Sequence, residues 1–395
     1  MNIVVFDDPT IRTDLMPFTL TRPVAAMRVG ILTIREKWEQ YFGQPASFLA
    51  QDYLQEKYPL QLDNDNLFIN GALCPDESIF NALRELQSGE VLGKNNTVLA
   101  VRGASFDFSK EKFSLKEYTA NVVLIDKPWK IFLENASQIK TDILIVTRGR
   151  KSAPLNDPYT KVYAPENIFI EEGAVIRDAT LNASTGPIYI GKKAEIQEGT
   201  VVRGSFALLE GSVVNMGGKM RGDTTIGPHC KVGGEISNAV IFGYSNKAHD
   251  GFLGSSVLGE WCNLGADTNT SNLKNNYDAV KLWNYGKKSF QNTGLTFCGL
   301  MMGDHSKAGI NTMFNTGTVV GVAANIFGDG YPRNFVPSFA WGGAAGFTTF
   351  QLEKAYETAS KAMERRSQML NDTDKRILQH VFNASQSERV WEKKF

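Results

Sequence analysis

Apolar residues recur at every sixth position in the second half of the chain. The residue four positions after each apolar one is usually small. A period of six fits neither the turn of an α-helix nor the alternation of an ordinary strand. It is typical of a three-sided coil in which each short strand sends one aliphatic side chain inward, so we predict a parallel β-helix. The apolar series comprises Ile190, Ile196, Val202, Leu208, Val214, Met220, Ile226 and Val232.

The same period continues in two later stretches. Ile170 and Ile176 are already six positions apart, so a β-helix domain is expected over residues 156–345. The irregular segment 269–298 interrupts the repeat and predicts a long loop over a site. The second series is Val240, Phe252, Leu258 and Leu264, with Asn246 as a polar interruption, and the third is Met302, Ala308, Phe314, Val320 and Ile326.

The two ends of the chain follow other patterns. Residues 1–155 alternate apolar runs with helical patterns and end in the polar linker RGRKSAPLNDP, which predicts an α/β domain with a mainly parallel sheet. We expect the helical segment that starts at Pro128 to pack at the edge of this sheet. Residues 346–395 show helical spacing and predict two helices that cap the β-helix.

Composition narrows the functional classes. Lys+Arg and Asp+Glu are both 42, so no net charge favours nucleic acid or an anionic membrane, and small-molecule partners are expected. The four cysteines are far apart and are expected to be buried and reduced. The apolar start MNIVVF is too short for a signal peptide, and no run reaches membrane-spanning length. We therefore expect a cytoplasmic protein.

One histidine lies between the first and second series. His249 stands in SNKAHDGFLGSSVLGEWCNLGADTNTSN, and NNYDAVK follows. This region resembles the acetyltransferase core of the bifunctional N-acetylglucosamine-1-phosphate uridyltransferase / glucosamine-1-phosphate acetyltransferase family. The likeness implies a left-handed parallel β-helix and a homotrimer with sites between the β-helices of neighbouring copies.

The resemblance also implies roles for individual residues. His249 would be the general base that deprotonates the amine of an amino-sugar phosphate, a role that an imidazole suits near neutral pH. Asn263 would contact the sugar, and either Asn276 or Asn272 would lie near the amine. Lys247 is a candidate phosphate ligand, and Phe252 replaces the family's tyrosine. The co-substrate acetyl-CoA would lie along the coils of Ala266, Ala308 and Ala324.

A second resemblance concerns the N-terminal domain. LMPFTLTRPVAAMRVGILTI resembles the second half of the sugar nucleotidyltransferase signature. The glycines of the first half are replaced by Asp7, Asp8 and Pro9, although glycine lets backbone N–H groups approach phosphates closely. The aspartate of the family's metal site is replaced by Ala72, with Asp76 the nearest carboxylate.

Two hypotheses follow for this domain. It is either a divergent nucleotidyltransferase or a scaffold that has lost catalysis. In the first case UTP would be bound by Arg12, Arg22, Arg28 and Lys37, since arginine binds phosphates through two donors at once. Asp7 and Asp8 would then hold Mg²⁺.

The leading hypothesis is therefore a bifunctional enzyme of sugar-nucleotide biosynthesis. It would acetylate glucosamine-1-phosphate and transfer UMP to a sugar-1-phosphate. One alternative keeps only the nucleotidyltransferase, with the β-helix as an oligomerisation module, and another is a non-catalytic trimeric scaffold. The sequence leaves open which amino sugar and which nucleoside triphosphate are used.

Overall fold

The chain folds into two compact units. The computed structural model describes residues 1–106 and 115–392. The N-terminal unit consists of residues 1–15, 21–27 and 32–127, and the prism unit consists of residues 16–20, 28–31 and 128–395. No helix in the described ranges is long and apolar enough to cross a lipid bilayer.

A mixed six-stranded sheet forms the centre of the N-terminal unit, in the order β2-β1-β3-β6-β5-β7. Strand β1 is parallel to β2 and β3, while β6 is antiparallel to β3 and β5. The sheet is thus less uniformly parallel than the alternation of runs predicted. Its strands are β1 (Asn2–Phe6), β2 (Ala46–Leu49), β3 (Asn66–Asn70), β5 (Val91–Lys94), β6 (Thr97–Gly103) and β7 (Leu115–Glu117), and β4 (Leu73–Cys74) pairs with β8 (Val123–Leu124).

Local signals set the ends of the helices in this unit. Helix α2 (Ile34–Phe42) begins with a reciprocal capping box between Thr33 and Glu36 and ends at Gly43 in the left-handed conformation. Asp76 accepts a hydrogen bond from the Ile79 N–H at the start of α3 (Glu77–Arg84). The remaining helices are α1 (Pro9–Asp14), η2 (Val24–Ala26) and η3 (Asp52–Leu54).

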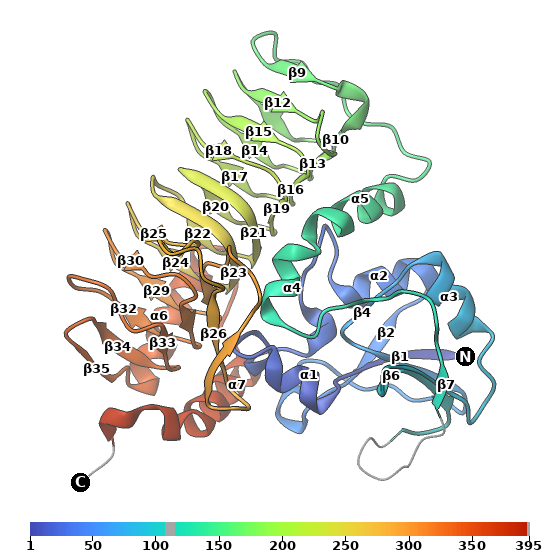
Figure 1. Ribbon diagram of the computed structural model, residues 1–395. Coiled ribbons are helices and arrows are strands. Elements are labelled where there is room, and N and C mark those ends of the chain that lie inside the picture. The colour runs from blue at the N-terminus through green and yellow to red at the C-terminus, as the bar shows by residue number, and fades with distance from the viewer. Residues whose placement is uncertain (107–114, 393–395) are drawn as a thin grey trace. The chain divides into compact units, whose positions relative to one another are not determined.

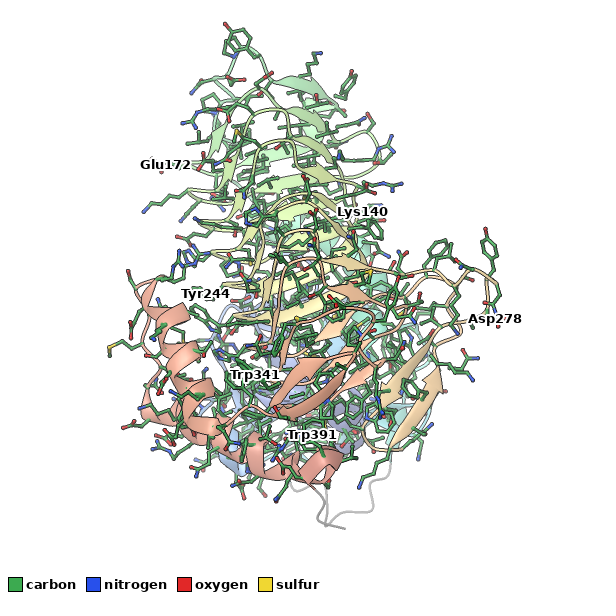
Figure 2. The ribbon with its side chains drawn as sticks, turned by 90° about the vertical axis from the view of Figure 1, so that its left-hand side faces the viewer. Lys140, Glu172, Tyr244, Asp278, Trp341 and Trp391 are labelled. Atoms are coloured by element: carbon green, nitrogen blue, oxygen red, sulfur yellow. The ribbon has the colours of Figure 1, made fainter. Side chains whose placement is uncertain are left out.

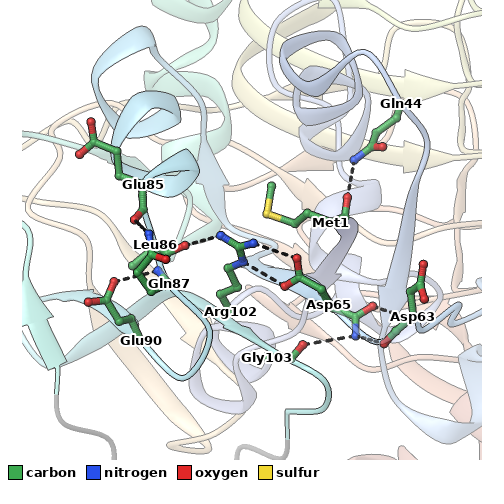
Figure 3. A network of polar contacts seen from close by, with 11 residues as sticks. Met1, Gln44, Asp63, Asp65, Glu85, Leu86, Gln87, Glu90, Arg102 and Gly103 are labelled. Carbon is green, nitrogen blue, oxygen red and sulfur yellow. Dashed lines mark hydrogen bonds and ion pairs between the residues drawn. The ribbon is translucent and has the colours of Figure 1, made fainter.

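A polar network closes one end of the sheet (Figure 3). Arg102 in β6 donates two hydrogen bonds of 2.9 Å to the carboxylate of Asp65, just before β3, and one of 2.6 Å to the Leu86 carbonyl. The paired geometry matches the planar guanidinium to the carboxylate. It fixes the register of β6 against β3.

The prism unit is a parallel β-helix, as predicted, and Figure 1 shows its coils stacked from β9 to β34. Each short strand pairs in parallel with the strand one coil later. The strands of the first coils are β9 (Lys161–Tyr163), β10 (Ile168–Ile170), β11 (Val175–Ile176), β12 (Thr180–Asn182), β13 (Ile188–Ile190), β14 (Glu195–Ile196), β15 (Val201–Arg203), β16 (Phe206–Leu208), β17 (Val213–Val214), β18 (Lys219–Met220), β19 (Thr224–Ile226) and β20 (Lys231–Val232). The later strands are β21 (Glu235–Gly243), β22 (Asn246–Lys247), β23 (Phe252–Glu260), β24 (Asn263–Leu264), β25 (Asn269–Thr270), β28 (Met301–Met302), β29 (Lys307–Ala308), β30 (Met313–Phe314), β31 (Val319–Val320), β32 (Asn325–Ile326), β33 (Phe335–Val336) and β34 (Ala340–Gly343).

The interior confirms the first and third apolar series and, in the second, confirms Leu258 and Leu264 but not the earlier positions. Every member from Ile190 to Val232 is at most 1% exposed and belongs to one core cluster. Beyond Val232 the inward positions are Ile236, Ile241, Lys247 and Leu253, not Val240, Asn246 and Phe252. The six-residue period is broken here because β21 forms parts of two faces of the β-helix without a turn between them. It pairs with β18 at its start and with β19 at its end.

The segment predicted as a long loop contains regular structure. Strand β25 still pairs with β30 in the stack, and an antiparallel hairpin follows, made of β26 (Lys281–Asn284) and β27 (Ser289–Asn292). The two predicted C-terminal helices are α6 (Leu352–Glu364) and α7 (Asp372–Ala384). They pack against turn residues of several coils, including Trp261 and Phe339, so they cover the side of the stack. The last coil is covered by β35 (Gly346–Thr349) and η6 (Val390–Glu392).

Helices α4 (Pro128–Leu133) and α5 (Asn135–Val146) belong to the prism unit, although the sequence placed them at the edge of the N-terminal sheet. Helix α4 packs on β21 and β23, and α5 packs on β16 and β19. Asn135 is fully buried; its amide donates to the Asp223 carbonyl and accepts from the Thr225 hydroxyl. These hydrogen bonds attach α5 to the coils.

Candidate functional site

A cleft of about 630 Å³ lies between the coils of the prism unit and helix α6. One wall is a row of outward-facing residues on successive coils: Lys231, Asn246, Asn263 and Lys307. They are aligned because each one pairs in register with the next. The amide of Asn246 donates to the Asn263 side chain at 3.4 Å. The parallel stacking therefore places polar side chains in a line along the cleft.

His249 lines this cleft in the exposed turn after β22. The turn is held from inside the β-helix by Lys247, which takes an inward position equivalent to that of Val232. The Lys247 ammonium donates to the carbonyls of His249 and Asp250, the latter at 2.7 Å. Burial lowers the pKa of Lys247 to about 8. The backbone of the His249 turn is therefore fixed while the imidazole remains accessible.

A column of stacked rings runs along the turns beside the cleft. His229, Tyr244, Trp261 and His305 all have positive φ angles between 53° and 62°. Their ring centroids are 5.1, 4.3 and 6.3 Å apart in that order. Tyr244 and Trp261 line the cleft, and Figure 2 shows Tyr244 on the side of the coils where the C-terminal helices lie. Stacking offsets the cost of the left-handed backbone and gives the cleft an aromatic wall.

The charge on the cleft has one sign. Lys231 comes from the coils, as does Lys307, whose ammonium donates to the carbonyls of Trp261 and His305. Lys361, Arg365 and Arg366 come from α6 and the turn after it. Arg366 donates to the Asn246 side chain at 2.9 Å, which joins the two walls. None of the described residues that line the cleft is acidic. Such a surface is complementary to a ligand with several phosphate groups.

The structure brings together only some of the residues predicted for acetyl transfer. His249, Asn263 and Ala266 line the cleft. Lys247 faces the interior, where carbonyls take up its ammonium, so it cannot serve as an open phosphate ligand in this conformation. Ala308 and Ala324 belong to the interior cluster, so their methyl groups point away from any ligand outside the coils.

The remaining predicted residues lie outside the cleft of one chain. Asn272 donates to the Ser255 hydroxyl at 3.4 Å, and both Asn272 and the Phe252 ring approach the backbone of Gly254. Asn276 is exposed and forms a hydrogen bond with Asp278 in the segment 269–298. Figure 2 shows Asp278 on the side of the prism unit away from Tyr244.

Sequence reasoning missed the contribution of α6. Lys361 and Arg365 are four positions apart and therefore share one helical face. This spacing was a usable signal for a basic face. Nothing in the sequence, however, connects a helix more than 100 residues downstream to the coil of His249.

The glycine of the N-terminal signature serves packing. Gly30 has φ +85°, and a Cβ there would lie 2.5 Å from an oxygen of Asp142 in α5. The N–H groups of Gly30 and Ile31 are bonded to Asn135 and Asp142, both at 2.8 Å. Arg28, predicted to bind nucleotide, belongs to the same segment of the prism unit and donates to the Ile31 carbonyl. These backbone donors are therefore used within the protein.

The other predicted nucleotide ligands lie in the interior of the N-terminal unit. Arg12, Arg22 and Lys37 are each less than a tenth exposed. The guanidinium of Arg12 donates to the Tyr53 hydroxyl at 2.6 Å and lies 3.8 Å from the carboxylate of Asp7. These side chains form part of a packed polar interior, and their binding of UTP remains a prediction.

The two aspartates have separate structural roles. Asp8 caps α1 by accepting hydrogen bonds from the N–H groups of Thr10 and Ile11. Asp7 accepts one from the Val24 N–H at 2.8 Å, and burial raises its pKa to about 7. Within the described ranges, no group of three or more His, Cys, Asp and Glu residues could hold a metal ion. The residues present do not form a ready site for Mg²⁺, which usually needs carboxylates together with substrate phosphates.

Residues 3–151 match the family model described as sugar nucleotidyl transferase. A protein of Synechococcus elongatus named "Bifunctional protein GlmU" is 25% identical over 247 residues, which cover 61% of this chain and 45% of that protein. A protein of Methanocaldococcus jannaschii with the same name is 30% identical over 296 residues, covering 69% of this chain and 65% of that protein.

Among solved structures, the polySia-specific acetyltransferase NeuO overlaps with a TM-score of 0.27 at 12% identity, covering 49% of this chain and 83% of that one. Nothing further follows from an overlap this low. The chain spans less than two thirds of the length of both curated relatives. Taken together, these matches show that the chain is similar to the proteins named GlmU, and that its segment 3–151, which matches a sugar nucleotidyl transferase model, precedes the β-helix.

Proposed function

We propose that the prism unit transfers an acetyl group from acetyl-CoA to the amine of an amino-sugar phosphate, with glucosamine-1-phosphate as the acceptor. The observation that carries this proposal is the single cleft that holds His249, Asn263 and a set of cations. A general base, an amide for sugar hydroxyls and a phosphate-binding surface are the groups that such a transfer requires.

In the proposed step His249 accepts a proton from the acceptor's ammonium group. The free amine attacks the thioester carbonyl and a carbon–nitrogen bond forms. The carbon–sulfur bond breaks, and the leaving thiolate takes up the proton that the nitrogen loses as it becomes an amide. Asn263 orients the sugar with one amide donor and one acceptor. Lys361 and Arg365 hold the phosphates of the acyl donor, as their place on the cleft wall suggests.

Release of free thiol from acetyl-CoA tests this proposal, with glucosamine-1-phosphate as acceptor. His249→Ala should abolish the release because the variant loses the imidazole that accepts the proton of the ammonium group. His380→Ala is the matched control, since His380 is exposed on α7. The absence of thiol release in the wild type would refute the assignment and favour a nucleotidyltransferase with a structural β-helix.

We further propose a cytoplasmic homotrimer with active sites shared between copies. The relatives and the β-helix support this, and Asn272 and Asn276 lie outside the cleft of their own chain. In a trimer they would reach the amino sugar from a neighbouring copy. Mixing His249→Ala with Asn276→Ala protein, after dissociation and reassembly, should then restore activity that neither variant has alone. No restoration would indicate complete sites within each chain.

For the N-terminal unit we propose transfer of UMP from UTP to a sugar-1-phosphate, because residues 3–151 match a sugar nucleotidyl transferase model. Release of pyrophosphate with UTP and N-acetylglucosamine-1-phosphate tests it. Arg12→Ala should lower the release if Arg12 contacts the nucleotide, whereas Arg84→Ala, on α3, is the control. An inactive wild type that binds no UTP would favour the scaffold hypothesis.

A further inference from the structure

A second cavity, of about 720 Å³, lies at the C-terminal end of the prism unit and is distinct from the His249 cleft. Its walls come from the hairpin β26–β27, strand β33, the turn between β34 and β35, and the segment 387–391. Figure 2 shows Trp391 at this end of the unit, far from Glu172 in the early coils. The volume lies in the range of small-molecule sites.

Aromatic rings line this cavity in two pairs. Trp283 stacks on Phe335 with centroids 4.4 Å apart and ring planes at 13°. Phe347 and Trp391 lie 5.8 Å apart, and the Trp391 indole N–H is fixed by the Thr349 hydroxyl at 2.9 Å. The turn between β34 and β35 contributes only the small residues Gly343, Ala344, Ala345 and Gly346. Rigid aromatic rings next to a turn with only small side chains leave room for a flat ligand with a π system.

Charged groups lie at defined places around these rings. Lys288, in the hairpin turn, and Arg333, before β33, are exposed residues of the cavity lining. Two such cations at the mouth are complementary to a phosphate group. Glu388 is the one carboxyl among the described lining residues, and burial raises its pKa to about 7. Its neighbour Arg389 is already committed to Glu392, Ser385 and the Phe382 carbonyl.

Two buried polar atoms of these residues have no hydrogen-bond partner among the described residues. They are the indole nitrogen of Trp283 and one carboxyl oxygen of Glu388. Buried polar groups are normally paired, so each such atom calls for an explanation. A ligand that satisfies both must present an acceptor to the indole and a donor to the carboxyl. Adenine carries an acceptor nitrogen next to an amino donor on one edge, and its two fused rings cover more of an aromatic side chain than the single ring of uracil does.

We propose that this cavity is a binding site for an adenosine phosphate, with the base against the aromatic rings and the phosphate at Lys288 and Arg333. Two sources share this chemistry: a free adenine nucleotide and the nucleotide end of coenzyme A. Neither the acetyltransferase nor the nucleotidyltransferase assignment is needed for the site. A ligand in this cavity would contact the hairpin β26–β27 and strand β33.

Photolabelling of the full chain with 8-azido-AMP, followed by peptide mapping, tests the proposal. We expect label on peptides that contain Trp283 or Trp391. Arg333→Ala should lower this labelling about tenfold or more, because a charged hydrogen bond is lost from an exposed side chain that does not support the fold. Lys140→Ala is the control: it removes an exposed cation on α5 that does not line the cavity.

Competition separates the two sources. If unlabelled AMP protects the peptides from labelling better than coenzyme A does, the natural ligand is a free nucleotide. If coenzyme A protects better, the natural ligand is the acyl donor. Either result supports the site. UMP should protect at least tenfold less well than AMP. Label confined to other peptides, or label on these peptides that Arg333→Ala and Trp283→Phe leave unchanged, would overturn the proposal. His249→Ala protein labelled in parallel keeps this result separate from the acetyltransferase assay.

Discussion

The ammonium group of Lys247 donates a hydrogen bond to the backbone carbonyl of His249 from inside the β-helix. A lysine at a position otherwise taken by aliphatic residues carries a desolvation penalty, because the charged form loses water. Here the carbonyls of His249 and Asp250 replace part of that water. We interpret Lys247 as a positioning residue that fixes the turn of the candidate general base.

Replacing Lys247 by methionine should lower the acetyltransferase activity without lowering the stability of the fold. Methionine fills a similar volume in the core and removes the buried charge, so thermal stability should stay equal or rise. The turn then loses both of its internal donors, and kcat for acetyl transfer should fall about tenfold or more with little change in KM. Steady-state kinetics and thermal unfolding on the same preparation measure both. Unchanged kcat would show that the turn holds its shape without the lysine.

The stability of the wild type should depend on pH through the same residue. The pKa of Lys247 is about 8 in the folded protein, against an ordinary value of 10.5. Between these values the unfolded chain binds more protons, so the free energy of unfolding should rise with pH. We expect an increase on the order of 1–2 kcal/mol, after discounting for solvent screening. Denaturant unfolding from pH 7.5 to 10 should show this rise in the wild type and not in Lys247→Met.

Asp7 should give the opposite trend at lower pH. Burial raises its pKa from 3.8 to about 7, so the folded protein binds more protons than the unfolded chain between these values. The free energy of unfolding contributed by Asp7 therefore falls as pH rises through that window. Asp7→Asn keeps an acceptor for the Val24 N–H and should be more stable than the wild type at pH 8 by on the order of 1–3 kcal/mol.

Urea unfolding at pH 8 and at pH 4.5 measures this difference, which should largely disappear at the lower pH. A variant that is less stable than the wild type at pH 8 would contradict it. That outcome would mean that the ion pair with Arg12, 3.8 Å away, outweighs the burial of the carboxylate.

The six-residue period was sufficient to predict the β-helix, because one inward side chain per strand is the requirement of that fold. It could not predict the register after Val232. There β21 continues from one face of the β-helix to the next without an intervening turn, so the inward residues Ile236 and Ile241 follow at intervals shorter than six. Counting positions along the sequence does not show where the turn between two faces of the β-helix is missing. The inward place of Lys247 follows from the pairing of β20 with β22, which only the structure provides.

The candidate site shows a similar division. The motif around His249 and Asn263 was visible because its residues and their spacing resemble those of a known family. The cations of α6 were not, since their distance to the coils depends on tertiary packing around Trp261 and Phe339. The N-terminal signature predicted the family model that residues 3–151 match, but it could not show that Gly30 packs closely against Asp142 and that its N–H group is bonded to Asn135.

The basic face of α6 should control affinity for the acyl donor. Lys361 and Arg365 are exposed residues of the cleft, so their replacement by alanine should leave the fold unchanged. If they hold phosphates of acetyl-CoA, the double variant should raise KM for acetyl-CoA about tenfold or more and leave KM for the amino sugar unchanged. The effect should shrink at high salt. Lys354→Ala, at the exposed start of the same helix, is the control. Equal changes in both KM values would indicate a general disturbance of the cleft.

Trp261 should determine whether α6 stays in place. It is only 9% exposed, stacks on Tyr244 at 4.3 Å and belongs to the cluster that holds both C-terminal helices. Trp261→Ala should cost about 3–5 kcal/mol in the free energy of unfolding, because a large aromatic contact is replaced by a cavity. The loss should be local at first, since the coils retain their own interior core. Amide hydrogen exchange should therefore accelerate in α6 and α7 while β14 and β17 stay protected, and Trp261→Phe should show a smaller change. Uniform acceleration through the early coils would mean instead that the aromatic column supports the β-helix as a whole.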